Sequence, residues 1–100
     1  MVKHIVLWTF KPQADGRSKQ ENLAIAKQKL EAMNGKIPGL KHLEVGINYN
    51  QRQGAWDLAL YSEHGTREDL EVYQNHPEHK KVVEYLGLVR DQRAVVDYEK

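Results

Sequence analysis

The stretch that decides the fold is a run of β-branched and aromatic residues, Val2-Lys3-His4-Ile5-Val6-Leu7-Trp8-Thr9-Phe10. Residues of these types favour strands, and Pro12 followed by Ala14-Asp15-Gly16 breaks the chain soon afterwards. Apolar side chains fall on both alternating faces of the run, which is typical of a strand that is covered on each side. We therefore predict a central strand over residues 2–10.

The rest of the chain alternates between helical and strand patterns. Ser18 and Glu21 have the spacing of a capping box, and apolar residues then recur every three or four positions until Asn34-Gly35. Period-two alternation predicts strands over residues 43–49 and 56–61. Thr66 caps a further helix, Pro77 interrupts it and starts another that frays at Leu86-Gly87, and a last strand covers residues 94–98. The predicted element order is βαββαβ.

Two strand–helix–strand halves with right-handed crossovers fold into a ferredoxin-like α+β domain. We expect one domain over residues 1–100, with a four-stranded antiparallel sheet, helices on one face, and the first and third strands at its centre. The uncovered face then exposes apolar side chains from two strands. In the first strand these are Ile5 and Leu7, or their even-numbered neighbours. In the third strand they are one row of Trp56, Leu58 and Leu60. A contiguous apolar patch of this kind predicts a homodimer in which two sheets meet back to back.

Composition excludes several classes of function. Fifteen Lys and Arg against fourteen Asp and Glu give a net charge of +1, so we expect no nucleic-acid partner. The chain has no Cys, which excludes disulfides, thiolate metal sites and a cysteine nucleophile. No apolar run is long enough to cross a membrane, and no haem-ligand motif is present. We expect a cytoplasmic protein without a membrane partner or a cofactor.

Four blocks of sequence resemble the stress-responsive A/B barrel (Dabb) family: Val2-Lys3-His4-Ile5-Val6-Leu7, Ile37-Pro38-Gly39-Leu40, Tyr73-Gln74-Asn75-His76-Pro77-Glu78-His79 and Val95-Val96-Asp97-Tyr98. The resemblance runs from residue 2 to 99 and implies a dimeric α+β barrel built from two ferredoxin-like protomers. The family includes proteins of unassigned activity, stress-associated plant proteins and a plant polyketide cyclase. That cyclase closes a linear poly-ketone by intramolecular aldol condensation.

The resemblance also implies roles for individual residues. The acid–base pair of the cyclase matches Tyr73 and His79, and a histidine on its first strand matches His4. Asp57 stands where the cyclase has a histidine, and Leu30 stands where it has a tyrosine. The resemblance therefore implies an acid–base pair, with a substrate different from that of the cyclase.

The candidate site has two interpretations, which the sequence leaves open. In the first, Tyr73 and His79 are catalytic, because an imidazole titrates near neutral pH and a phenol can polarise a carbonyl. In the second, His76 caps the helix at Pro77, His79 bonds a carboxylate such as Asp57, and Tyr73 simply packs. The residues that we expect to bind a ligand are His4, Trp8, Asp57, Tyr61 and His76.

Metal binding is a further alternative for the same residues. His76 and His79, with His4 and Asp57, offer nitrogen and oxygen ligands, but Pro77 between the two helical histidines argues against a shared ion, so we expect none. Two functions remain. One is a binding module for a small apolar or aromatic molecule held between sheet and helices. The other is an acid–base lyase or cyclase that acts on a polyketide-like carbonyl compound.

Overall fold

The computed structural model describes residues 1–100. It contains the predicted βαββαβ order with one short addition near the start. The elements are β1 (Val2–Phe10), β2 (Gln13–Ala14), β3 (Arg17–Ser18), α1 (Lys19–Glu31), β4 (Leu40–Ile47), β5 (Leu58–His64), α2 (Arg67–Asn75), α3 (Pro77–Val89) and β6 (Arg90–Glu99).

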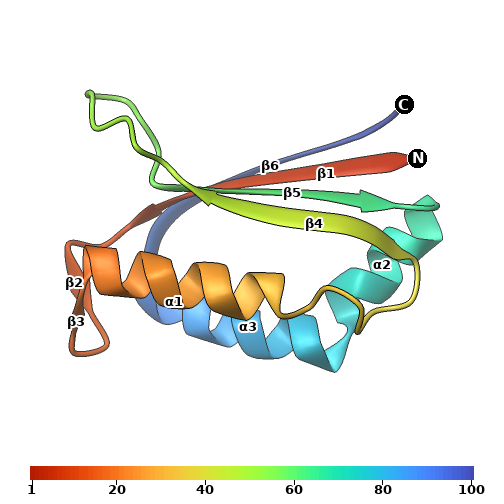
Figure 1. The fold of residues 1–100 in the computed structure, drawn as a ribbon, viewed down its shortest axis with the longest axis horizontal. Coiled ribbons are helices and arrows are strands. Elements are labelled where there is room, and N and C mark those ends of the chain that lie inside the picture. Colours follow the sequence, from red (N-terminus) through yellow and green to blue (C-terminus); the bar gives the residue numbers. More distant parts are fainter.

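Four strands form an antiparallel sheet in the order β4-β5-β1-β6, so β1 and β5 lie at its centre as predicted. All three helices cover one face of this sheet, and the other face carries no helix (Figure 1). The loop between β4 and β5 rises on the uncovered side, and the two chain termini lie together at one end (Figure 1). The ferredoxin-like fold is confirmed.

The register of the strands decides which side chains face the helices, because residues directly opposite each other share a face of the sheet. All even-numbered residues of β1 are buried under the helices, and the odd-numbered ones lie on the uncovered face. Leu58 and Leu60 of β5 also lie on the helix side and are buried. The expectation that these two leucines face solvent is therefore wrong.

The uncovered face has an apolar part and a charged part. Leu7 lies opposite Ala59 and Ala94, and Ile5 lies opposite Val96. Towards the other end, the uncovered face carries charged and polar residues that bond to one another, namely Lys3, Glu63, Tyr61, His42 and Glu44. The surface that the sequence predicted to be apolar throughout is apolar only in part.

Helix boundaries follow from local chemistry. The predicted capping box at the start of α1 is present, with Ser18 Oγ accepting from the Glu21 amide and the Glu21 carboxylate accepting from the Ser18 amide. Thr66 caps α2 by accepting from the Asp69 amide. Pro77, as predicted, separates α2 from α3, because it provides no N–H and fits the first turn of a helix.

Several boundaries differ from the prediction. β4 covers Leu40–Ile47 instead of residues 43–49, and β6 begins at Arg90 instead of residue 94. Asp15 and Gly16 have positive φ and close a short β2–β3 hairpin, where the sequence indicated only a break. α3 continues through Gly87 to Val89, since the burial of Leu86 and Val89 against the sheet holds the last turn. β5 begins after Trp56 and extends to His64, which places a buried histidine on its helix face. No helix in this chain has the length and apolar character needed to cross a bilayer.

Candidate functional site

A cavity of about 430 Å³ lies between the sheet and α3. Val83, Gly87 and Arg93 at its edge are exposed, so the cavity opens to solvent between α3 and β6. Its wall is mainly apolar with a few polar groups, which is the usual composition of a small-molecule site. The lining residues are His4, Val6, Trp8, Leu30, Leu60, Tyr73, Gln74, His79, Val82, Val83, Leu86, Gly87, Arg90 and Arg93.

His4 is buried on the helix face of β1 and is held by a carboxylate from the far end of the chain. Asp97 lies directly opposite it on β6, and His4 Nδ1 donates to Asp97 Oδ1. A buried imidazole needs such a partner.

His64 is buried beside His4 and Tyr73. Its Nε2 lies 2.9 Å from Ser62 Oγ, and its Nδ1 is buried without a hydrogen-bond partner. Burial, together with the nearby His4, lowers the pKa of His64 from its ordinary 6.5 to about 4. His64 is therefore neutral at pH 7.

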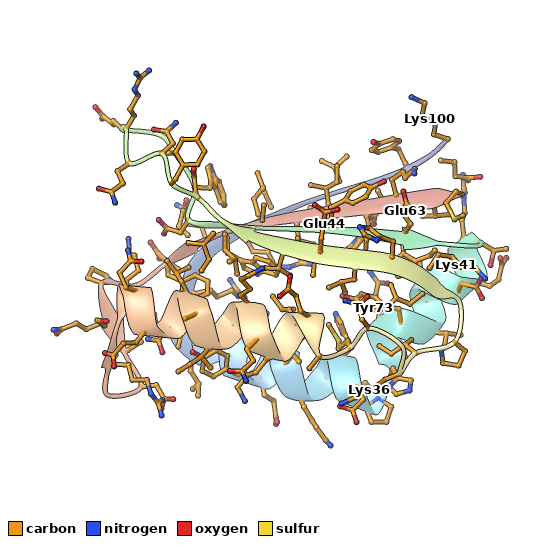
Figure 2. The ribbon with its side chains drawn as sticks, in the orientation of Figure 1. Lys36, Lys41, Glu44, Glu63, Tyr73 and Lys100 are labelled. Carbon is orange, nitrogen blue, oxygen red and sulfur yellow. The ribbon has the colours of Figure 1, made fainter.

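Tyr73 and His79 meet at the break between α2 and α3. Their ring centroids are 4.5 Å apart, and the Tyr73 ring also lies 4.9 Å from that of His64. Figure 2 shows Tyr73 on the helix side of the sheet, and Glu44 and Glu63 on the opposite side. The chain direction changes at Pro77, and this change brings together two residues that one continuous helix would not place on the same face.

The surroundings of this pair set its protonation. Burial raises the pKa of Tyr73 well above its ordinary value, so the phenol keeps its proton. Burial lowers the pKa of His79, and the Gln74 carbonyl, which accepts from His79 Nδ1 at 3.1 Å, opposes that shift. With Nδ1 as the donor, Nε2 of neutral His79 is an acceptor. The arrangement therefore combines a hydroxyl donor, Tyr73, with an imidazole acceptor, His79, in one cavity.

Four of the predicted site residues line the cavity, namely Tyr73, His79, His4 and Trp8. Trp8 forms part of the wall and does not fill the space that reaches His79. The remaining three, Asp57, Tyr61 and His76, do not line it.

Asp57 does not pair with a histidine, contrary to one of our expectations. It lies just before β5, accepts from the Phe10 amide at 2.8 Å and forms an ion pair with Lys19 at 3.4 Å. It therefore anchors the end of β1 to the start of α1.

Tyr61 and His76 also have other partners. Tyr61 lies on the uncovered face of the sheet and donates to Glu63, because odd-numbered residues of β5 point away from the helices. His76 caps α3, and its Nδ1 accepts from the Glu78 amide at 3.1 Å, as the second interpretation predicted. No group of three or more His, Cys, Asp or Glu residues is arranged to hold a metal ion.

Sequence reasoning missed several residues of the site, namely Arg90 and Arg93 in the cavity lining and His64 and Asp97 beside it. His64 lies on the same face as Leu58 and Leu60 at even spacing, so a longer predicted strand would have identified it. Asp97 was recognised only as part of a sequence block. Its pairing with His4 depends on the register of β1 with β6, which sequence spacing alone does not give.

Comparison with known proteins gives a consistent result for the fold. The family model described as Stress Responsive A/B Barrel Domain (Dabb) matches residues 2–100. A search of curated proteins finds no match. Among solved structures, a dimeric protein of unknown function with a ferredoxin-like fold from Bacteroides fragilis is 36% identical, with 99% of this chain and 95% of that chain covered and a TM-score of 0.87.

Two more distant structures share the fold. A dimeric ferredoxin-like protein of unknown function from Thermobifida fusca is 24% identical, with 99% of this chain and 90% of that chain covered and a TM-score of 0.78. A hydroxynitrile lyase from Passiflora edulis is 18% identical, with 97% and 90% covered and a TM-score of 0.78. At these identities the likeness concerns the fold alone.

Proposed function

This chain belongs to the stress-responsive A/B barrel (Dabb) family, and from that premise we propose that it acts as a homodimer in which each protomer binds a small, mainly apolar molecule. The observation that carries the proposal is the cavity of about 430 Å³ between the sheet and α3. Hydrophobic side chains form the larger part of its wall, and a few polar rings are available to orient a ligand.

Gly87 offers a direct test of ligand binding. It lines the cavity from α3, and a Cβ at this position meets no atom within 4 Å, so a larger side chain has room. We expect Gly87→Phe to obstruct the cavity while the helix stays folded, because glycine is a poor helix former. The probe is N-phenyl-1-naphthylamine, a neutral apolar dye whose fluorescence rises in apolar surroundings.

The matched control is Leu88→Phe, one position further along α3 at an exposed residue that does not line the cavity. We expect the wild type and Leu88→Phe to bind the dye equally. Gly87→Phe should bind it at least about tenfold more weakly, which corresponds to roughly 1.4 kcal/mol of binding free energy. Absence of dye binding in the wild type, or equal binding by all three proteins, would contradict the proposal.

The uncovered face of the sheet supports the homodimer. Ile5, Leu7 and Val96 lie together on this face, and a second copy of the chain placed back to back would bury them. The Bacteroides fragilis and Thermobifida fusca proteins are both described as dimeric. Lys3 and Glu63 at one end of the same face form an ion pair and so carry balanced charge.

A second candidate function is acid–base catalysis on a carbonyl compound. The contact between Tyr73 and His79 inside the cavity favours it. In this reaction, His79 Nε2 takes a proton from the carbon next to a carbonyl. The electron pair of the broken C–H bond forms a C=C bond, and the π pair of the carbonyl moves to its oxygen to give an enolate. The Tyr73 hydroxyl, which retains its proton, donates a hydrogen bond to that oxygen.

Proton exchange from acetophenone in D₂O, followed by loss of the methyl NMR signal, tests this candidate. We expect the wild type to exceed the buffer rate, and Tyr73→Phe and His79→Ala each to lower the excess by about a hundredfold or more. His42→Gln, a change on the uncovered face, is the control and is expected to match the wild type. A wild type that is no faster than buffer leaves binding alone as the function.

A further inference from the structure

One wall of the cavity carries two arginines from β6, Arg90 and Arg93. Arg93 lies directly opposite Trp8, whose side chain is buried on the helix side of β1. Residues opposite each other share a face, so Arg93 belongs to the cavity side of the sheet. Arg90, at the start of β6, lies opposite buried Phe10 on the same side.

Neither arginine has an acidic partner. The ion pairs of the structure all involve other residues. No Asp or Glu lines the cavity. Asp97, on the same face of β6, already accepts from His4. Asp91, between the two arginines in the chain, neither lines the cavity nor forms an ion pair. The cavity therefore presents two guanidinium groups whose charge the surrounding side chains do not balance, although the whole chain carries only +1.

The two arginines stand beside a largely apolar part of the wall. Arg93 is exposed at the opening, and the aliphatic residues Val6, Leu60 and Val82 are buried. An apolar pocket with an unbalanced cation at its opening suits an amphipathic molecule that has an apolar body and an anionic head group. A carboxylate is a small head group whose two oxygens match the fork of a guanidinium.

We propose that the ligand of this cavity is a small amphipathic carboxylate, with its carboxylate held by Arg93 and Arg90 and its apolar body between the sheet and α3. This inference rests on the proposed binding function and adds the chemical class of the ligand. In such a complex, the rings of His4 and His79 lie along the apolar body.

The test uses two probes of equal chain length, decanoate and 1-decanol, at pH 7.5, where decanoate is ionised. Each is titrated against protein loaded with N-phenyl-1-naphthylamine, and its affinity is measured by displacement of the dye. We expect Arg93→Gln to weaken decanoate about tenfold, the usual effect of losing a charge-assisted bond, and to leave 1-decanol unchanged. Added salt weakens decanoate binding in the wild type and has less effect in the variant.

The control is Arg52→Gln, which removes an arginine without an ion pair from the loop between β4 and β5, away from the cavity. We expect it to behave as the wild type with both probes. If dye binds but neither Arg93→Gln nor the double variant with Arg90→Gln changes decanoate affinity, the inference is wrong and the binding function stands. If the wild type binds no dye, the binding function fails, and the inference fails with it.

Discussion

At the scale of single residues, the site depends on three histidines with different partners. His4 donates to Asp97 and His79 donates to the Gln74 carbonyl, both through Nδ1. His64 instead uses Nε2 towards Ser62 and leaves Nδ1 without a partner. An unsatisfied buried nitrogen costs stability, and a proton added there has no acceptor to stabilise it. The folded chain therefore disfavours protonation of His64.

Acid should therefore destabilise the fold through His64. Its pKa is about 4 when folded and 6.5 when exposed, so between these values the unfolded chain binds the proton and the folded chain does not. The contribution of His64 to the free energy of unfolding is complete above pH 6.5 and is lost as the pH falls towards 4. This loss is at most about 3 kcal/mol. The His64 ring contacts the rings of His4 and Tyr73, and its pKa also responds to the charges of Asp97 and Asp69. The variant tested below keeps these four residues.

Urea unfolding at pH 7.5 and pH 4.5, at one fixed protein concentration, measures this effect. His64→Gln removes the titration and keeps an amide that can bond to Ser62. Between the two pH values, we expect the free energy of unfolding of the variant to fall by about 1–3 kcal/mol less than that of the wild type. An equal loss in both proteins would show that other groups cause the acid sensitivity.

At the scale of secondary-structure elements, the segments that connect them also require particular residues. The segment that joins α1 to β4 passes close to the start of α2, with Gly39 at φ +82°. A Cβ built on Gly39 would lie 2.4 Å from Cγ and 2.7 Å from Cβ of Asp69. Rotation of the Asp69 side chain moves its Cγ but leaves its Cβ in place, so the contact cannot be relieved by a rotamer change alone.

Gly39→Ala should therefore cost more than an alanine placed elsewhere at positive φ. Gly35 is the matched control, with φ +79° and no atom within 4 Å of an added Cβ. We expect Gly35→Ala to lower the free energy of unfolding by about 1–2 kcal/mol through backbone strain. Gly39→Ala should lower it by about 1–3 kcal/mol more, because the backbone or α2 must shift. Urea unfolding measures both, and equal losses would mean that α2 shifts freely.

At the scale of the whole molecule, the uncovered sheet face is the surface still to be accounted for. Val96 is 58% exposed on this face, opposite Ile5. The exposed apolar residues of the helices are Val72, Val83 and Leu88, and single exposed apolar residues are ordinary. A dimer through the uncovered face therefore predicts that a charge at Val96 disrupts assembly and that a charge on a helix does not.

Sedimentation equilibrium at micromolar concentration tests this expectation. We expect the wild type to be a dimer, and Val96→Lys to shift to a monomer, because two unpaired lysines would be buried. Val72→Lys, at a residue of α2 that is 45% exposed, is the control and should remain a dimer. A monomeric wild type, or a Val96→Lys dimer of unchanged strength, would contradict the back-to-back arrangement.

Much of the fold was predictable because its causes are local. The run Val2–Phe10, the cap at Ser18 and the break at Pro77 each depend on neighbouring residues, and each occurs in the structure. Where a local rule competed with packing, packing prevailed, as at Gly87, where the buried residues on either side keep α3 helical. A cytoplasmic location and a lack of nucleic-acid partners stay predictions.

The sequence by itself determined the order of elements, the antiparallel sheet and the residue types available for chemistry, since periodicity and capping act within a few positions along the chain. Tertiary structure alone decided that Asp97 holds His4, that Asp57 binds Phe10 and Lys19, and that His64 is buried beside Tyr73. The physical reason is register: a shift of one residue between two strands sends every side chain to the other face.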